Sequence, residues 1–387
     1  MKVALSTIGT FHSFDLAREL HRDDLLTRIY TGYPRFKLKG EGLPAERIRC
    51  FPWVHGAYMA FPYRDSLGET LVRQWEYLAR ASLDRYVAST LSECDVFVGL
   101  SGSALLSGRK VHQRGGRYVC DRGSSHIREQ DALLREEHDR WGVAYTGIDP
   151  RIMAREEAEY AEADCITVPS SFNVRSFIQH GVDERKLRRL PYGVNLGRFH
   201  PTQQPDPQRF DVLFAGGMSL RKGVPYLLQA YQQLVHPRKS LSFAGAPSAD
   251  LIALMRQRGL WPEDAVVLGH VPQAELKNLM SRSHVMVLPS IEEGLALVQA
   301  QAMACACPVI GTVNTGAEDL FVDGEHGYIL PIRQVQALAE RLQWLADHPD
   351  ARHEMGRKAL AHVQQTGGWR DYGRHAISIY QTLMNGK

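Results

Sequence analysis

Several kinds of motif are missing from this sequence, and each absence argues against a class of function. The six cysteines include no CxxC pair, so neither a zinc site nor a disulfide framework is expected. No HExxH or comparable histidine spacing occurs, and no DxD triplet is present. A Walker loop is absent, and no clean GxGxxG follows a strand, which disfavours nicotinamide and flavin cofactors. We therefore expect neither a metal ion nor an organic cofactor.

Long apolar runs and a strong charge imbalance are also lacking. The nearest candidate for a membrane span, residues 294–311, carries Gln299, Gln301 and Pro308. The first residues, MKVALSTIG, fit a β-strand better than a secretory signal, so we expect a cytoplasmic protein. A net charge of +3 is too small to indicate nucleic acid as a partner. It suits an anionic small molecule or an acidic membrane surface equally well.

Short apolar runs alternate with helical patterns along the chain, and this alternation occurs twice. Buried-strand patterns occupy 3–7, 95–102, 117–125 and 165–170, and after the Pro- and Gln-rich stretch 200–208 they recur at 211–217, 240–246, 265–270, 284–290, 308–313 and 327–331. Strands separated by single helices predict right-handed crossovers and parallel sheets. The sequence therefore predicts an α/β protein with two doubly wound, Rossmann-like domains joined near 191–209, whose ligands bind beyond the carboxyl ends of the strands.

The segment AGGMSLRKG (215–223) follows one predicted strand and precedes a helical pattern. Gly216 and Gly217 permit a tight turn whose main-chain N–H groups face an anion. Arg221 and Lys222 add a planar fork of donors and a point charge, as a diphosphate requires. A solvated basic turn is the other interpretation of the same residues.

The segment PSIEEGLALVQAQAMACACPVIG (289–311) places an acidic loop before a helix predicted around 297–304. The helix N-terminus presents free N–H groups and a positive dipole end, which is a natural phosphate clamp. Glu293 stands just before this helix, where it accepts hydrogen bonds from sugar hydroxyls or caps the helix. Gln301 lies further along the helix and is placed to hydrogen-bond a ribose.

These two segments resemble the signature of the retaining family-4 (group 1) glycosyltransferases, which have the GT-B fold. RKGVPYLLQAY (221–231), RRLPYGVNLGRFHP (188–201), GHVPQAELKNLMSRSHVMVLPS (269–290) and NTGAEDLFVDGEHGYILP (314–331) match the family in form, and the resemblance spans most of residues 165–375. It implies an acceptor-binding domain at 1–190, a nucleotide-sugar-binding domain at 191–370, and a helix at 371–387 that crosses back onto the first domain. Gln301 stands where the family has its second Glu, Gly217 stands where a basic residue is frequent, and the loop reads Gly-Leu-Ala instead of Gly-Phe-Gly.

The resemblance also implies roles for individual residues. It assigns catalysis to Glu293, Arg221, Lys222 and His126, and donor binding to Gly216, Gly217, Val271, Pro272, Ser290, Gly294, Leu295, Ala296, Leu297, Val298 and Gln301. In the N-terminal half, the strand ends place Gly9, Thr10, His12 and Asp121 on the acceptor side of the cleft. A lone histidine is more often structural than functional, so both interpretations of His126 stay open.

The function expected on this basis is transfer of a sugar from a nucleotide-diphosphate sugar to a hydroxyl acceptor, with retention of anomeric configuration and without a metal. The acceptor is expected to be a saccharide or lipid-linked saccharide in envelope polysaccharide synthesis, and nucleic acid is not expected to bind. The alternatives are a nucleotide-sugar epimerase of GT-B fold and a catalytically weak nucleotide-sugar-binding protein. The aromatic and basic segment 53–90 has three interpretations: peripheral contact with the inner face of the membrane, binding of a large acceptor, or ordinary helix packing. Its aromatic residues are Trp53, Tyr58, Phe61, Tyr63, Trp75, Tyr77 and Tyr86.

Overall fold

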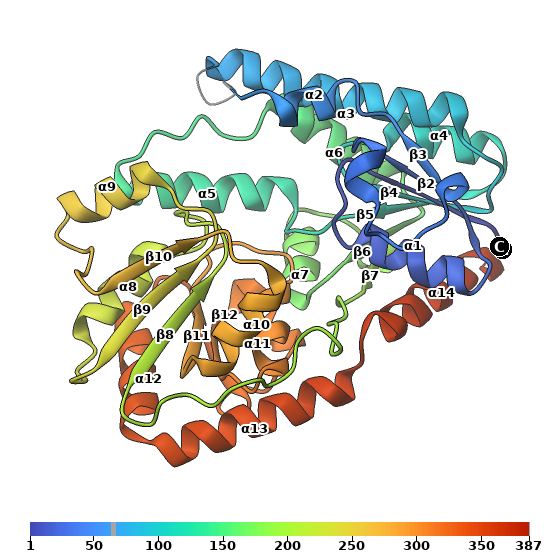
Figure 1. Ribbon diagram of the computed structural model, residues 1–387. Coiled ribbons are helices and arrows are strands. Elements are labelled where there is room, and N and C mark those ends of the chain that lie inside the picture. The colour runs from blue at the N-terminus through green and yellow to red at the C-terminus, as the bar shows by residue number, and fades with distance from the viewer. Residues whose placement is uncertain (63–66, 387) are drawn as a thin grey trace.

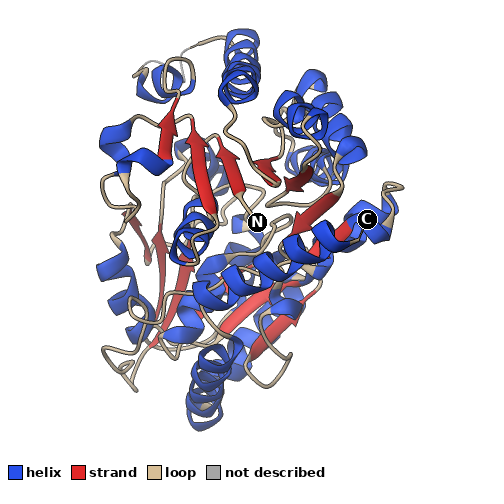
Figure 2. Cartoon of the chain, turned by 90° about the vertical axis from the view of Figure 1, so that its right-hand side faces the viewer, coloured by secondary structure: helices blue, strands red, loops and turns tan. Residues whose placement is uncertain are grey.

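The computed structural model describes residues 1–62 and 67–386 of the chain. Two α/β domains lie side by side, each built on a parallel sheet with helices on both faces (Figures 1 and 2). This arrangement confirms the predicted GT-B architecture of two Rossmann-like domains. None of the helices in the described part of the chain combines the length and the apolar character needed to cross a bilayer.

The N-terminal sheet has seven strands in the order β3-β2-β1-β4-β5-β6-β7. Their bounds are Val3–Thr7 (β1), Leu26–Thr31 (β2), Ile48–Cys50 (β3), Val96–Leu100 (β4), Arg117–Asp121 (β5), Cys165–Val168 (β6) and Leu187–Arg189 (β7). β1, β4, β5 and β6 are almost wholly buried, because helices cover both faces of the sheet. The chain reverses direction across the sheet between β1 and β4, which is the switch point where ligands bind in such folds.

The C-terminal sheet has six strands in the order β10-β9-β8-β11-β12-β13. Their bounds are Phe210–Ala215 (β8), Lys239–Ala244 (β9), Ala265–Gly269 (β10), Val285–Leu288 (β11), Val309–Thr312 (β12) and Gly327–Leu330 (β13). Its switch point lies between β8 and β11, which pair in parallel. The loops after these two strands carry the basic turn and the Glu293 segment, so the topology brings the two sequence motifs to one place.

Fourteen helices in the described part of the chain cover the sheets. They are Ser13–Arg22 (α1), His55–Ala60 (α2), Glu69–Thr90 (α3), Leu105–Gln113 (α4), Ile127–Trp141 (α5), Pro150–Glu162 (α6), Ser171–Gln179 (α7), Val224–Gln233 (α8), Ala249–Gln257 (α9), Gln273–Arg282 (α10), Leu297–Ala304 (α11), Val335–Asp347 (α12), Pro349–Thr366 (α13) and Trp369–Asn385 (α14). In the N-terminal domain one core forms under α1 and α14 and another under α3, α4 and α6. The C-terminal domain likewise has one core under α8 and α12 and another under α10, α11 and α13.

The two domains exchange elements at their boundary. α13 packs on the C-terminal domain, and α14 then crosses to the N-terminal domain, where Tyr372, Ala376 and Tyr380 join the core under α1 (Figure 1). This returning helix begins at Trp369, two residues before the predicted start. In the other direction, α5 extends from the N-terminal domain over the C-terminal one, and its Trp141 lies in the core formed by α8 and α12.

Three short strands were not anticipated from the sequence: β2, β3 and β7. β2 and β7 each carry polar residues, and β3 has three residues, so none gives a long apolar run. The aromatic segment 53–90 forms α2 and α3, where Trp75 packs against Tyr58 and donates a hydrogen bond to the Val54 carbonyl. Tyr63 lies outside the described residues. Trp53 remains 77% exposed beside these helices.

Candidate functional site

A cavity of about 390 Å³ opens at the switch point of the C-terminal sheet. We call it the glycine-loop cavity, and it is lined by Ala215, Gly216, Lys222, Ala244, Gly245, His270, Val271, Leu276, Glu293, Leu295, Ala296, Leu297, Val298 and Gln301. These residues come from the ends of β8 and β9, from the loops after β8, β9, β10 and β11, and from α10 and α11. Most of the predicted donor-binding residues thus lie on one cavity, together with Ala215, Ala244, Gly245, His270 and Leu276.

Two glycines shape the floor of this cavity at the ends of neighbouring strands. Gly216 and Gly245 have φ angles of 144° and 151°, a conformation that residues with a side chain rarely adopt. A Cβ at position 245 would lie 2.0 Å from the Gly216 carbonyl oxygen, so the two loops approach as closely as their backbones allow. Both glycines line the glycine-loop cavity, and their N–H groups donate to the carbonyls of Ala244 and Gly269.

Lys222 is the cation that lines the glycine-loop cavity, and its ammonium forms an ion pair with the carboxylate of Glu293. The two side chains come from opposite sides of the switch point, one after β8 and the other after β11. Among the described lining residues Glu293 is the only carboxylate. This charge pair lies next to the N-terminus of α11. It is chemically suited to a ligand that carries both an anionic group, for the cation and the helix N-terminus, and hydroxyl groups, for the carboxylate.

Arg221 is directed differently from its neighbour. Its Nε donates to the Glu292 side chain at 2.9 Å and to the Glu292 carbonyl at 3.0 Å, while its Nη2 lies 3.7 Å from Glu293. It is not among the described lining residues of the glycine-loop cavity. The structure therefore places Arg221 outside the lining of the glycine-loop cavity, on the acidic loop that it holds through Glu292.

Glu292 is a site residue that the sequence analysis missed. Its carboxylate is fully buried and accepts hydrogen bonds from Ser124, Ser125 and Gln130 of the N-terminal domain as well as from Arg221. Burial alone would raise its pKa, but Arg221 and the two serines bring the pKa down to about 2, so the group is a carboxylate at neutral pH. The sequence signal for this residue was the pair of adjacent glutamates, Glu292 and Glu293, directly before Gly294. Each of two adjacent carboxylates needs its own set of hydrogen-bond partners.

The remaining predicted donor residues surround this centre. Gly294 packs against the backbone of Gly123, and Ser290 is buried beneath the acidic loop, where its carbonyl accepts from Thr312. Gly217 is exposed with open space around it, and Pro272 caps the start of α10. Gln301 lines the glycine-loop cavity and also a second cavity of about 460 Å³, which Thr10 and Arg18 line from the N-terminal domain.

The predicted N-terminal residues do not gather at the glycine-loop cavity. His126 is buried between Tyr160 and Phe177, stacks on His180, and caps α5 by accepting from the Arg128 N–H. Burial, followed by the charge of His180, lowers the pKa of His126 to about 4. The structure therefore supports the structural interpretation of this histidine. Its sequence position at a strand end is explained by helix capping.

His12 and Asp121 form a buried pair at the ends of β1 and β5. The ring Nε2 of His12 lies 2.6 Å from a carboxylate oxygen of Asp121, whose other oxygen accepts from the Thr167 hydroxyl at 2.8 Å. Tyr192 of the interdomain linker stacks on His12 with ring centroids 4.3 Å apart. Gly9 lies near this pair and accepts a hydrogen bond from Thr31. These contacts connect the loop after β1 to β5, to β6 and to the interdomain linker.

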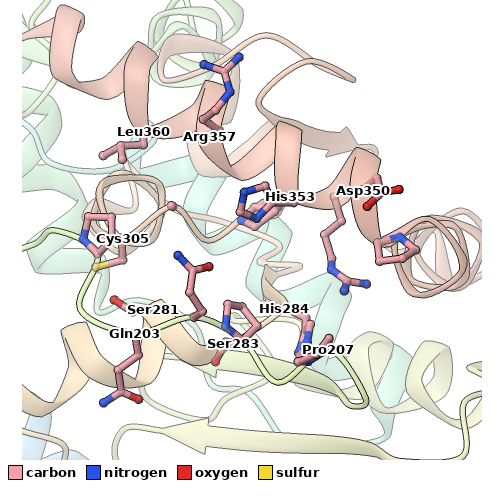
Figure 3. A pocket seen from close by; sticks show the side chains of 17 residues that line it. Gln203, Pro207, Ser281, Ser283, His284, Cys305, Asp350, His353, Arg357 and Leu360 are labelled. Atoms are coloured by element: carbon pink, nitrogen blue, oxygen red, sulfur yellow. The ribbon is translucent and has the colours of Figure 1, made fainter.

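A further cavity of about 430 Å³ lies at the opposite edge of the C-terminal sheet (Figure 3). Ser283 and His284 precede β11, Cys305 precedes β12, and His353 and Arg357 come from α13. Because these residues stand at the amino ends of the strands, this cavity is separate from the candidate site. Within 1–62 and 67–386, no group of three or more His, Cys, Asp or Glu side chains is arranged to hold a metal ion.

Comparison with known proteins gives a family match for the C-terminal part of the chain. Residues 198–362 match the family model of glycosyl transferases group 1. D-inositol 3-phosphate glycosyltransferase of Arthrobacter sp. (strain FB24) is 31% identical over 213 residues, which cover 50% of each chain. The putative colanic acid biosynthesis glycosyltransferase WcaL of Salmonella typhimurium is 28% identical over 217 residues, covering 52% of this chain and 53% of its own. The chain thus spans about half the length of these curated relatives.

Solved structures share the whole fold at low sequence identity. Sucrose-phosphate synthase of Thermosynechococcus elongatus superposes with a TM-score of 0.74 and 19% identity, covering 100% of both chains. Alr3699/HepE of Anabaena, solved in complex with UDP and glucose, has a TM-score of 0.72 and 16% identity over 99% of this chain and 100% of its own. These likenesses establish the two-domain fold, including the N-terminal half that the family model leaves unmatched.

Proposed function

We propose that the chain transfers a sugar from a nucleotide-diphosphate sugar to a hydroxyl acceptor. The premise is that residues 198–362 match the family model of group 1 glycosyltransferases. The observation that carries this proposal is the shared cavity of Lys222, Glu293 and the start of α11. A diphosphate needs a cation and free N–H donors, and a sugar needs a hydrogen-bond acceptor. The glycine-loop cavity offers all of these within about 390 Å³.

Binding of such a donor requires Lys222 and Glu293 to exchange partners. In the free protein the two charges satisfy each other. A bound diphosphate would take the ammonium of Lys222, which releases the Glu293 carboxylate to accept hydrogen bonds from the sugar hydroxyls. As the bond between the sugar and the diphosphate breaks, Lys222 and the first N–H groups of α11 would stabilise the growing negative charge. Each such donor contributes roughly 2–4 kcal/mol by comparison with removal of a single oxyanion donor.

We propose that the transfer retains anomeric configuration and needs no metal. The lining of the cavity bears on the route of transfer, because Glu293 is the one described carboxylate there and is held by Lys222. Glu292 lies next to it but is buried with a full set of hydrogen-bond donors, so it is not free to attack a sugar. A double displacement would need a free carboxylate at the reacting carbon. In the route we propose, the acceptor hydroxyl attacks from the face that the diphosphate leaves, and a phosphate oxygen of the donor accepts its proton. This route needs no free carboxylate.

The acceptor would be held by the N-terminal domain, and a saccharide or lipid-linked saccharide is the class we propose. The relatives named for inositol phosphate and for colanic acid biosynthesis act on polyhydroxylated acceptors or products, by their names. Trp53 and Leu71, exposed by 77% and 59% beside α2 and α3, offer apolar side chains for a peripheral contact with a membrane that carries such an acceptor.

The direct test is a panel of UDP-, GDP- and ADP-sugars titrated against the full chain by calorimetry, followed by assay of acceptor-independent hydrolysis. We expect one base to bind in the micromolar range and to be hydrolysed slowly. Lys222→Met should lower nucleotide affinity at least tenfold, whereas Lys358→Met, at an exposed lysine on α13, should leave it unchanged. Binding without hydrolysis or transfer would favour a nucleotide-sugar-binding protein, and absence of any nucleotide binding would refute the proposal.

A further inference from the structure

The Glu292 carboxylate is buried at the junction of the two domains, and most of its partners come from the domain to which it does not belong. One oxygen accepts from the Ser124 hydroxyl at 2.6 Å, the Ser125 hydroxyl at 2.7 Å and the Ser125 N–H at 3.1 Å. The other accepts from Gln130 at 3.1 Å and from Arg221 at 2.9 Å. Only Arg221 among these five donors belongs to the C-terminal domain.

A buried carboxylate of this kind has strong requirements. Its two oxygens offer about four acceptor positions, and here five donors converge on them. Hydrogen bonds to a charged group are shorter and stronger than neutral ones, whereas an unpaired buried charge costs several kcal/mol. Separation of the domains would remove four donors at once and leave Arg221 alone with the charge. Protein donors therefore hold the carboxylate in one orientation only while the two domains are docked.

The backbone on either side of Glu292 and Glu293 is held by the N-terminal domain as well. Asn173, on α7, donates to the Glu293 carbonyl at 3.3 Å. The carbonyl of Gly123 lies directly against Gly294. Because Glu293 stands between these contacts, the place of its carboxylate relative to Lys222 depends on residues of the opposite domain.

We infer that Glu292 is a positioning residue, which couples docking of the N-terminal domain to the placement of Glu293 and Arg221 in the donor site. This inference rests on the proposed function. Ser124 and Ser125 fix the Glu292 carboxylate, the carboxylate fixes the Nε of Arg221, and Arg221 Nη2 then lies 3.7 Å from Glu293. The N-terminal domain thus contributes to the donor site by orienting its acidic loop, in addition to holding the acceptor.

The test removes the serine hydroxyls and keeps every charge in place. We expect Ser124→Ala/Ser125→Ala to lower kcat for the best donor at least tenfold, because Glu293 and Arg221 lose their fixed orientation. The Kd for the corresponding nucleoside diphosphate should stay within twofold, since Lys222 and the α11 N-terminus are untouched. Glu292→Gln should shift kcat in the same direction.

A matched control exists at a second interdomain contact. Ser171, at the start of α7, donates through its N–H and its hydroxyl to the carboxylate of Asp319, which is also buried at the domain junction but does not line the glycine-loop cavity. Ser171→Ala removes one serine–carboxylate bond between the domains, as each change at 124 and 125 does. We expect its kcat to remain within twofold of the wild type.

The outcomes separate the inference from the function on which it rests. If the wild type binds no nucleoside diphosphate and shows no turnover, the proposed function fails. The inference alone fails if the wild type is active and the double serine variant matches it in kcat. It also fails if Ser171→Ala loses as much kcat as the double variant, or if the double variant loses nucleotide binding and thermal stability together. Either result would show that the serines only hold the two domains together and have no specific effect on Glu293. The single variant Ser124→Ala, at a partly exposed position, provides the same measurement if the double variant does not fold.

Discussion

The carbonyl oxygen of Gly123 occupies the space in which a side chain at Gly294 would begin. A Cβ built on Gly294 would lie 1.9 Å from that oxygen, closer than any real contact. The two residues belong to different domains and to the turns after β5 and β11. Their contact makes the acidic loop and the N-terminal domain one packed unit, and it explains physically why this loop carries a glycine directly after Glu293.

Substitution of Gly294 by alanine should therefore force the domains apart at the candidate site. We expect Gly294→Ala to cost about 1–3 kcal/mol in stability, as overpacked substitutions do, and to reduce turnover severely. Gly68→Ala, at the start of α3, is the matched control, because a Cβ at that position meets nothing within 4 Å. Chemical denaturation and steady-state kinetics on both variants check the prediction, and equal behaviour of the two would contradict it.

A second prediction concerns the ion pair of Lys222 with Glu293. Glu293→Gln removes a negative charge that competes with a diphosphate for the ammonium. We expect UDP, or the diphosphate of whichever base binds, to bind roughly threefold to tenfold more tightly to the variant, which corresponds to about 1 kcal/mol. Sugar transfer should fall at the same time, because a neutral amide holds the sugar hydroxyls less strongly.

The control for this prediction is a double-mutant cycle with Lys222→Met. Since the two side chains are in contact, their effects should not add, and the gain from Glu293→Gln should vanish once Lys222 is gone. Calorimetric titration of the nucleoside diphosphate against all four proteins gives the coupling energy. A gain that persists in the double variant would show that Glu293 acts on the diphosphate without Lys222.

The positions of the motifs were predictable from the sequence, whereas the partners of their side chains were not. Strand periodicity and the switch-point rule bring Gly216, Lys222 and Glu293 to one cavity, because parallel strands end at the same edge of a sheet. The direction of Arg221 depends on Glu292, whose partners Ser124 and Ser125 lie far away in sequence. His126 was ambiguous for a similar reason: its neighbours Phe177 and His180 come from α7 and from the residue that follows it.

The attachment of α5 to the C-terminal domain leads to a prediction about stability. Trp141 is 8% exposed and lies in the core under α8 and α12, where its Nε1 donates to Glu137, and Glu137 in turn accepts from Arg333. Trp141→Ala should lower the free energy of unfolding by about 3–5 kcal/mol. Trp53→Ala, at an exposed tryptophan, should change it by no more than about 0.5 kcal/mol. Similar losses in both variants would show that α5 is not anchored as described.

The last prediction concerns the pH dependence that His126 confers on stability. Its pKa in the folded protein is about 4, below the usual value of 6.5, so the unfolded chain binds the proton more readily between these two values. The contribution of His126 to stability is therefore fully present above about pH 6.5 and is lost as the pH falls toward 4. His126→Asn keeps a side-chain acceptor for the Arg128 N–H but cannot titrate. We expect the free energy of unfolding, measured in urea from pH 4 to 7, to fall less steeply with acid in this variant than in the wild type. An unchanged slope would mean that His126 is not held neutral by its surroundings, and that the stack of His126 on His180 tolerates the charge.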